Sequence, residues 1–174
     1  DEKANVAVAR YRHDISNDFS LGAIGTFRQG DDYANNVAGA DARWRKGAHT
    51  VTAQFLHSQS EYPAAIVDLY KNDLGNDATP SGDAWRTQYS FSNRNWNFDA
   101  WHEEIDPGFR ADLGFIGMVG YDKSLLGGQR MWYRDGKAFE RISLYADWDV
   151  THRFDGQLLE REFEAQVGVN GPMQ

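Results

Sequence analysis

Apolar and polar residues alternate along most of the chain, with clusters of Gly, Asp, Asn and Ser between the alternating segments. A period of two predicts β-strands with one apolar and one polar face. The clearest segments are Asn36–Arg45, Thr50–Ser58, Ala84–Phe91, Trp96–His102, Arg141–Val150 and Glu160–Val167. Weaker candidates are Ala4–Arg12, Ser20–Arg28, Ala111–Tyr121 and Arg130–Arg134. The sequence therefore predicts an all-β fold of about ten strands.

The connections between these segments differ in length. Lys46–His49 is short enough for a hairpin, so the strands beside it should pair antiparallel. Compact turns alternate with longer loops at Gln29–Asn35, Gln59–Gly82 and Glu103–Phe109, while Arg134–Lys137 is short on the long-loop side. Short turns at one rim and long loops at the other are typical of an antiparallel up-and-down β-barrel. Residues 1–174 would form a single barrel domain or part of a larger barrel, with one or two helical turns at Ala64–Tyr70.

The alternation itself has two interpretations. In a soluble β-sandwich the apolar face points into the core and the charged face meets water. In a membrane barrel the apolar face meets lipid and the polar face lines a wet lumen. Periodicity does not separate the two. The apolar face is rich in alanine and carries aromatic residues near segment ends, as an aromatic girdle would, and Ala-rich faces pack poorly as a soluble core.

Composition narrows the possible functions. The chain has 174 residues, enough for one domain with a sizeable core. Its formal net charge of −8 would repel a phosphate backbone, so we expect no nucleic-acid partner. It contains no cysteine, which removes disulfides, thiolate metal sites and a cysteine nucleophile. No segment approaches the ~18 consecutive apolar residues of a membrane-spanning helix. The first residues show no export signal, so any signal would lie outside this sequence.

Motifs for catalysis, metals or cofactors do not stand out. Glu103 and Glu104 are adjacent, but neighbouring residues of a strand point to opposite faces, so they do not make a glycosidase-like acid pair. The histidines have no metal-ligand spacing, and the Gly-Asp fragments near residues 30 and 75 do not continue into a calcium loop. We therefore predict no catalytic residues, no metal and no cofactor. The Glu160, Glu162 and Glu164 series should be a solvated strand face or an acidic lumen wall.

The candidates for lining a lumen or binding a ligand are charged or aromatic residues of the polar face and its loops. They are Asp41, Arg43, Asp99, Trp101, Glu103, Arg110 and Asp112. Asp106–Phe109 should form a rigid bend between two strands. Pro107 suits the second position of a type II turn, and Gly108 could take the positive φ that the next position needs.

Three stretches, AGADARW from Ala38, HTVTAQF from His49 and DPGFRADLGFI from Asp106, resemble a bacterial family of envelope proteins. That family carries a family 9 carbohydrate-binding-like module followed by a large β-barrel-like domain of unknown function, to which residues 36–121 are similar. The resemblance implies an outer-membrane barrel segment, sometimes labelled a membrane-associated hydrolase, and it transfers no catalytic residue. The carbohydrate-binding-like module has no counterpart in this sequence, which also does not end in an aromatic strand. We therefore expect an internal part of a larger barrel.

Two functional hypotheses follow. The first is an outer-membrane β-barrel segment with a polar lumen and a structural or transport role. Its partners would be the lipid bilayer, other barrel-forming segments and carbohydrate. The alternative is a soluble glycan-binding β-sandwich or an accessory domain of a carbohydrate-active hydrolase, suggested by the six tryptophans and the acidic composition. Hydrolysis by the chain itself would rest on the family label alone, so a non-enzymatic role is favoured.

Overall fold

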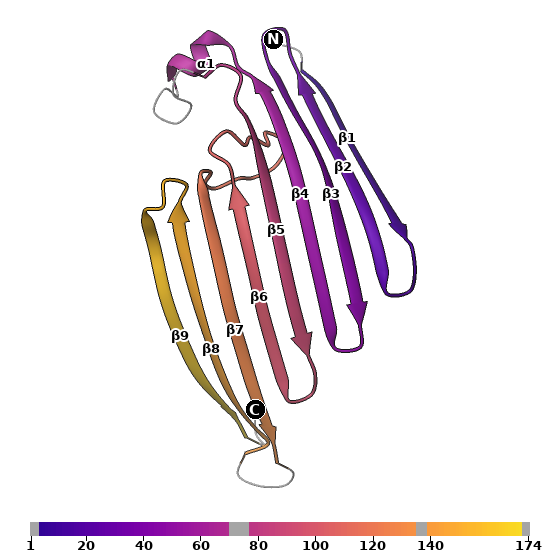
Figure 1. Cartoon of the computed structure of the whole chain (residues 1–174), viewed down its shortest axis with the longest axis vertical. Helices are drawn as coiled ribbons and strands as arrows, with labels where there is room; N and C mark the ends of the chain where they lie inside the picture. The colour runs from indigo at the N-terminus through magenta and orange to yellow at the C-terminus, as the bar shows by residue number, and fades with distance from the viewer. Residues whose placement is uncertain (1–3, 70–76, 135–138, 172–174) are drawn as a thin grey trace.

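The computed structural model describes residues 4–69, 77–134 and 139–171, which form one antiparallel sheet (Figure 1). Its nine strands follow one another in chain order. They are β1 (Asn5–Asp14), β2 (Phe19–Gln29), β3 (Ala34–Lys46), β4 (His49–Glu61), β5 (Ser81–Ser92), β6 (Trp96–Ile105), β7 (Tyr121–Tyr133), β8 (Arg141–Arg153) and β9 (Leu158–Asn170). A short helix, α1 (Ala64–Leu69), lies between β4 and β5 and confirms the expected helical turns over these residues, while Tyr70 lies outside the described residues. The all-β, antiparallel up-and-down fold is confirmed.

The sheet is open rather than closed. Within the described residues, β1 and β9 are its two edges, and each of them pairs with a neighbour on one side only (Figure 1). The structure thus shows nine strands where the alternation predicted about ten. The sheet is consistent with part of a barrel wall.

The strand expected at Ala111–Tyr121 is wrong. Residues 106–120, here called the inner loop, connect β6 to β7, and the segment expected at Arg130–Arg134 is the end of β7. Glycines recur through the loop, and Gly120 has a φ of 75° that a strand residue would not adopt. The alternation of Leu113, Phe115 and Val119 therefore imitates a strand where the backbone turns repeatedly. Gly108 has no positive φ, so the type II turn predicted there is also wrong.

The two rims of the sheet differ as expected. Compact hairpins join β1 to β2, β3 to β4 and β5 to β6 at the lower rim in Figure 1, and the hairpin at Gly47 uses a φ of 57°. The inner loop and the connection containing α1 lie at the other rim. Because residues 106–120 are not a strand, β7 ends and β8 begins at the hairpin rim, and residues 135–137 of the turn predicted at Arg134–Lys137 lie outside the described residues. The short connection at the rim of long loops is instead the β8–β9 turn at residues 154–157.

The strand register sorts the paired strand side chains onto two faces, with one register shift between Thr151 and His152 in the β8–β9 pair. Trp44, Phe55, Leu126 and Phe163 belong to one face, and they are 37%, 48%, 49% and 69% exposed. The opposite face carries the predicted polar residues of β3 and β6. We call these the apolar face and the polar face. Most large apolar side chains of the strands are thus exposed rather than packed into a core.

The buried core lies on the polar face instead. Phe109 of the inner loop is fully buried against Val37, Ala84 and Ile105, which come from β3, β5 and β6. This small cluster exists because the inner loop folds back over the sheet. The apolar face has no comparable cover among the described residues. No helix in the described part of the chain is long and apolar enough to cross a membrane.

Candidate functional site

The inner loop is held on the polar face by hydrogen bonds to strand side chains. Asn35 of β3 donates to the carbonyl oxygen of Arg110 (3.1 Å) and accepts from the backbone N–H of Asp112 (3.0 Å). Ser58 of β4 accepts from the backbone N–H of Arg110 (2.9 Å). Asn35 and Ser58 are fully buried. These contacts make the loop part of the polar face.

Two tyrosines outside the strands hold the middle of the inner loop at Asp112. Asp112 accepts hydrogen bonds from the hydroxyl of Tyr62 at 3.0 and 3.1 Å and from that of Tyr33. Burial, and then the negative charge of Asp112, raise the pKa of Tyr62 to about 12. Burial and the hydrogen bond to Asp112 also raise the pKa of Tyr33. Both phenols therefore stay protonated and continue to donate across the neutral pH range.

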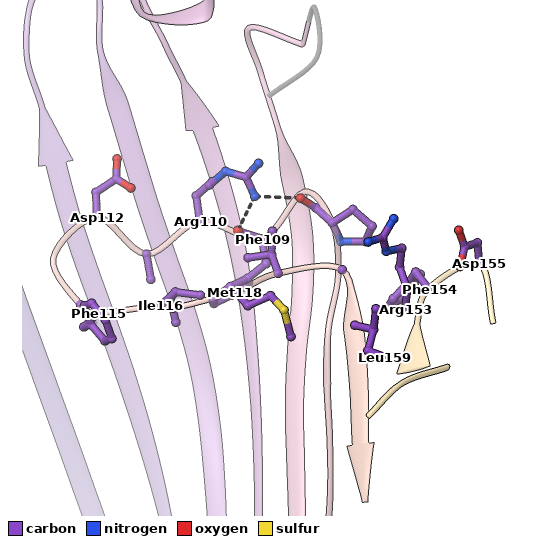
Figure 2. A pocket seen from close by; sticks show the side chains of 16 residues that line it. Phe109, Arg110, Asp112, Phe115, Ile116, Met118, Arg153, Phe154, Asp155 and Leu159 are labelled. Atoms are coloured by element: carbon purple, nitrogen blue, oxygen red, sulfur yellow. Dashed lines mark hydrogen bonds between the residues drawn. The ribbon is translucent and has the colours of Figure 1, made fainter. Parts of the chain in front are cut away.

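An open pocket of about 990 Å³ lies between the inner loop and the β8–β9 turn (Figure 2). The loop contributes Phe115, Ile116 and Met118, whereas Arg153 and Asp155 come from the end of β8 and the turn. Phe115 is 93% exposed. The pocket combines apolar loop side chains with charges at its border.

Three predicted residues gather on β6. Asp99 accepts hydrogen bonds from Gln88 (2.8 Å) and Ser90 (2.6 Å) of β5. The guanidinium of Arg86 lies 4.3 Å from the ring centroid of Trp101 and 3.2 Å from a carboxylate oxygen of Glu103. Asp99, Trp101 and Glu103 therefore lie on the same face, as the alternation predicted, but in two separate groups of contacts. Glu104 lies on the opposite face, so the two adjacent glutamates do not form a pair.

The remaining predicted residues lie elsewhere. Asp41 forms an ion pair with Arg10 of β1, and Arg43 lines a smaller pocket beside the β1–β2 turn. Arg110 donates to the carbonyl oxygens of Pro107 (2.8 Å) and Phe109 (2.7 Å), so its guanidinium helps to shape the inner loop. The structure thus divides the predicted set among the inner loop, β6 and the β1–β3 region.

Charge is distributed unevenly over the polar face. The register places a row of carboxylates on the last two strands: Asp147, Asp149, Glu160, Glu162 and Glu164. Lys123 of β7 lies 3.0 Å from Asp149 and 3.5 Å from Glu160. Cationic side chains of this face gather on the first three strands: Arg10, Arg12, Arg28, Arg43 and Arg45. The expected acidic wall is therefore opposed by a basic region at the other edge of the sheet.

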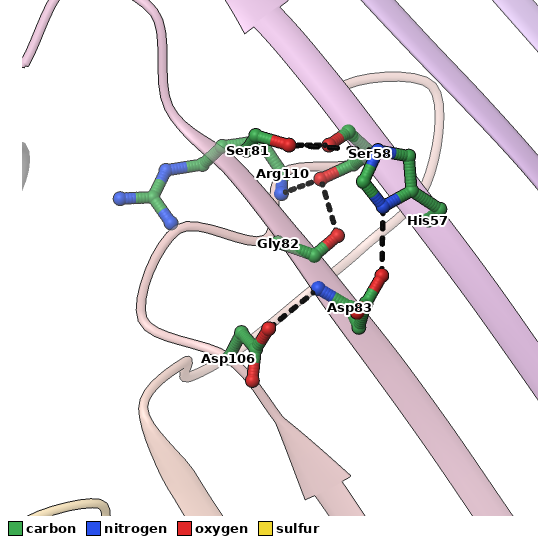
Figure 3. Close-up of polar contacts among 7 residues, drawn as sticks. All are labelled: His57, Ser58, Ser81, Gly82, Asp83, Asp106 and Arg110. Carbon is green, nitrogen blue, oxygen red and sulfur yellow. Dashed lines mark hydrogen bonds and ion pairs between the residues drawn. The ribbon is translucent and has the colours of Figure 1, made fainter.

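A row of polar residues crosses the apolar face near the loop rim, and the sequence analysis did not predict it. We call it the polar band: His57, Ser81, Asp83, His102 and Ser124. His57 Nδ1 lies 2.7 Å from Asp83 Oδ1, and His57 Nε2 lies 3.5 Å from Ser81 Oγ (Figure 3). Further along the band, His102 Nδ1 lies 2.7 Å from Ser124 Oγ. The one available signal was that these polar residues interrupt the apolar positions of their strands. Their proximity depends on the β4–β5 register across a long connection.

No group of three or more His, Asp or Glu side chains in the described ranges is placed to hold a metal ion. Comparisons of the chain with protein-family models, curated proteins and solved structures found no match. The functional interpretation therefore depends on the geometry of the sheet and its two faces.

Proposed function

We propose that this sheet forms part of the wall of an outer-membrane β-barrel, with the apolar face against lipid and the polar face lining an aqueous lumen. The observation that carries the proposal is the exposure of large apolar side chains on one face of strands from β2 to β9, while the buried core lies on the other face. In a soluble sandwich a second sheet would cover that apolar face. The described residues form one sheet.

Strand length supports this arrangement. The strands have 10 to 13 residues, and a tilted strand needs about 9–11 residues to cross the hydrocarbon layer. On β8 the apolar positions continue from Ile142 to Val150, and on β9 from Phe163 to Val169. These lengths suit a spanning strand.

The borders of the apolar face also resemble membrane interfaces. Trp44, Trp96 and Trp132 lie near strand ends at the hairpin rim. The guanidinium of Arg130 lies 4.5 Å from the ring centroid of Trp96 and 5.5 Å from that of Trp132. The His-rich polar band bounds the same face at the loop rim. Aromatic residues and long cationic side chains are favoured at the level of lipid headgroups.

The open edges set a further requirement. In hydrocarbon, backbone N–H and C=O groups need partners, so β1 and β9 would each have to pair with another strand. Those strands would come from other barrel-forming segments or another copy of the chain. Once closed, such a wall would enclose the inner loop and the charged networks. A structural or transport role follows from a lumen of this kind.

Partitioning tests the proposal. We expect the purified chain to need detergent and to float with phosphatidylethanolamine and phosphatidylglycerol vesicles on a density gradient. Far-ultraviolet circular dichroism should show β-structure in the floating fraction. A chain that stays folded and monomeric in buffer without detergent, and does not float, would contradict the proposal.

A further inference from the structure

We propose that Ser81, His57 and Asp83 form a hydrolytic site on the apolar face that cleaves the ester bond of an acyl lipid. Ser81 would be the nucleophile, His57 the general base and Asp83 the residue that positions the histidine. The assignment of the site rests on the contacts in Figure 3. The lipid substrate class also rests on the proposed membrane location.

The order of the contacts is that of a nucleophile, a base and an orienting acid. The Asp83 carboxylate 2.7 Å from His57 Nδ1 favours the tautomer with the proton on that nitrogen. The lone pair of His57 Nε2 is then directed to Ser81 Oγ, 3.5 Å away. Catalytic hydrogen bonds are often long without substrate. In this structure the Ser81 hydroxyl donates to the carbonyl oxygen of Ser58 (3.0 Å), and rotation about the Cβ–Oγ bond redirects its proton.

The backbone that carries Ser81 is supported from the opposite face. Asp106 accepts a hydrogen bond from the N–H of Asp83 (2.8 Å), and its own N–H donates to the Asp83 carbonyl oxygen (2.9 Å). A Cβ atom at Gly108 would lie 2.2 Å from the Ser81 carbonyl oxygen, and one at Gly82 would lie 2.5 Å from the backbone nitrogen of Phe109. The inner loop therefore packs directly behind the nucleophile and restricts its movement.

The surroundings indicate the class of substrate. Moving along the strands from His57 and Asp83 into the apolar face, the next cross-strand pair is Phe55 and Trp85. These two side chains offer an apolar surface for an acyl chain. Ser81 is the first residue of β5 and lies at the loop rim. A membrane lipid would place its ester bonds at this level, between its acyl chains and its headgroup.

The reaction balances with the lipid and water alone. Ser81 Oγ attacks the ester carbonyl while its proton moves to His57 Nε2. The acyl–oxygen bond of the ester breaks, and the leaving alcohol takes the proton from His57. Water, deprotonated by His57, then attacks the acyl-serine. The bond between Ser81 Oγ and the acyl group breaks, Ser81 takes the proton back from His57, and the carboxylic acid is released. Gln59 faces Ser81 across the β4–β5 pair, where its amide would donate to the carbonyl oxygen that becomes negative.

A serine-directed fluorophosphonate probe tests the site in detergent micelles. Ser81 Oγ would bond to phosphorus, fluoride would leave, and His57 would take the serine proton. We expect the probe on the peptide containing Ser81, with labelling abolished in S81A and slowed about 10³-fold or more in H57A. S124A is the matched control because Ser124 contacts His102 in the same band, and it should label normally. Absence of labelling in the folded chain, or equal labelling of S81A, would overturn the proposal.

The positioning role of Asp83 is tested by the tautomer of the His57 ring as well as by the labelling rate. In D83N the amide would donate to His57 Nδ1 and force the ring proton onto Nε2, so labelling should fall about 10⁴-fold. Nitrogen-15 spectra of the histidine ring should show the proton move from Nδ1 to Nε2, and D83E should restore part of the rate. An unchanged tautomer and rate in D83N would show that Asp83 has no positioning role.

Two ester substrates separate this proposal from the membrane proposal. Hydrolysis of water-soluble p-nitrophenyl butyrate depends on the triad alone, whereas hydrolysis of phosphatidylcholine in vesicles also needs membrane contact. We expect both activities, and both should be lost in S81A. Butyrate hydrolysis by a chain that does not float would overturn the lipid substrate and the membrane location but support the triad. Flotation without hydrolysis of either ester would overturn the triad and leave the membrane location standing.

Discussion

The two faces of the sheet belong to the same strands but differ in what covers them. On the polar face, side chains pair with one another and the inner loop covers a small core around Phe109. On the apolar face, residues such as Leu126 and Phe163 stay exposed. The comparison shows that alternation identifies two faces without showing which of them is inside. Here the loop, rather than the apolar stripe, determines where the core lies.

Neighbouring leucines of β7 provide the strongest test of this comparison. Leu126 lies on the apolar face, and Leu125 lies on the polar face beside the acidic residues of β8. We expect L126R to weaken membrane insertion by about 2–4 kcal/mol because a charge would enter hydrocarbon. L125R should change insertion little, because its guanidinium would stay in the lumen near Asp149. Vesicle flotation at increasing urea measures the difference, and equal effects of the two changes would contradict the assignment of the faces.

Neighbouring asparagines of β3 provide a second matched pair. Asn35 is fully buried and bonds to Ser60 as well as to the inner loop, whereas Asn36 lies on the apolar face. Asn35→Ala would remove the hydrogen bonds to the carbonyl oxygen of Arg110 and from the N–H of Asp112, so we expect a loss of about 2–3 kcal/mol. Urea unfolding in micelles, followed by tryptophan fluorescence, measures it. A loss in Asn36→Ala as large as in Asn35→Ala would show that the loop contacts add no stability.

Gly108 tests how closely the loop approaches β5. We expect Gly108→Val to lower the free energy of unfolding by about 1–3 kcal/mol, because the new side chain would overlap the backbone of Ser81. Gly117→Val is the control, since the nearest atom to a Cβ there lies 3.7 Å away on Phe115. The urea midpoint should fall for the first variant and stay nearly constant for the second. An unchanged midpoint in Gly108→Val would contradict the packing described here.

Of these substitutions, Tyr62→Phe should have the smallest effect on the free energy of unfolding. Tyr62→Phe removes the hydroxyl that donates to Asp112, so we expect a loss of about 0.5–1.5 kcal/mol. Because the pKa of Tyr62 is raised to about 12, its contribution is complete at neutral pH and is lost as the pH rises through that value. Tyr121 and Tyr145 also have pKa values raised to about 12, so an absorbance titration at 295 nm should lose the amplitude of one tyrosine near pH 12 in the variant. An unchanged amplitude near pH 12 would contradict the raised pKa of Tyr62.

Much of the fold was predictable because local patterns determine it. The alternation in β3 and β6 placed Asp41, Asp99 and Trp101 on the polar face correctly. The hairpin at Gly47 followed from a short connection between two such segments. These features depend on residues that are near one another in the sequence, so a period of two and turn chemistry were sufficient.

Other features depend on contacts between distant segments. The inner loop has the apolar content of a strand, and its path is determined by Asn35 and Ser58 in strands far earlier in the chain. His57 meets Ser81 and Asp83 only through the register of β4 and β5. A shift of one residue in that register would move a side chain to the other face. Sequence patterns do not determine register across so long a connection.

The proposed barrel wall requires the apolar face to contact lipid and the polar face to contact water. Of the six tryptophans, which all lie in the described residues, Trp101 is on the polar face, and Trp148 of β8 is on the apolar face. Two variants that each keep one of these tryptophans can be placed in vesicles containing brominated phosphatidylcholine. We expect bromine to quench Trp148 strongly and Trp101 weakly, and aqueous acrylamide to give the reverse order. Equal quenching by bromine, or stronger quenching of Trp101, would contradict the proposed barrel wall.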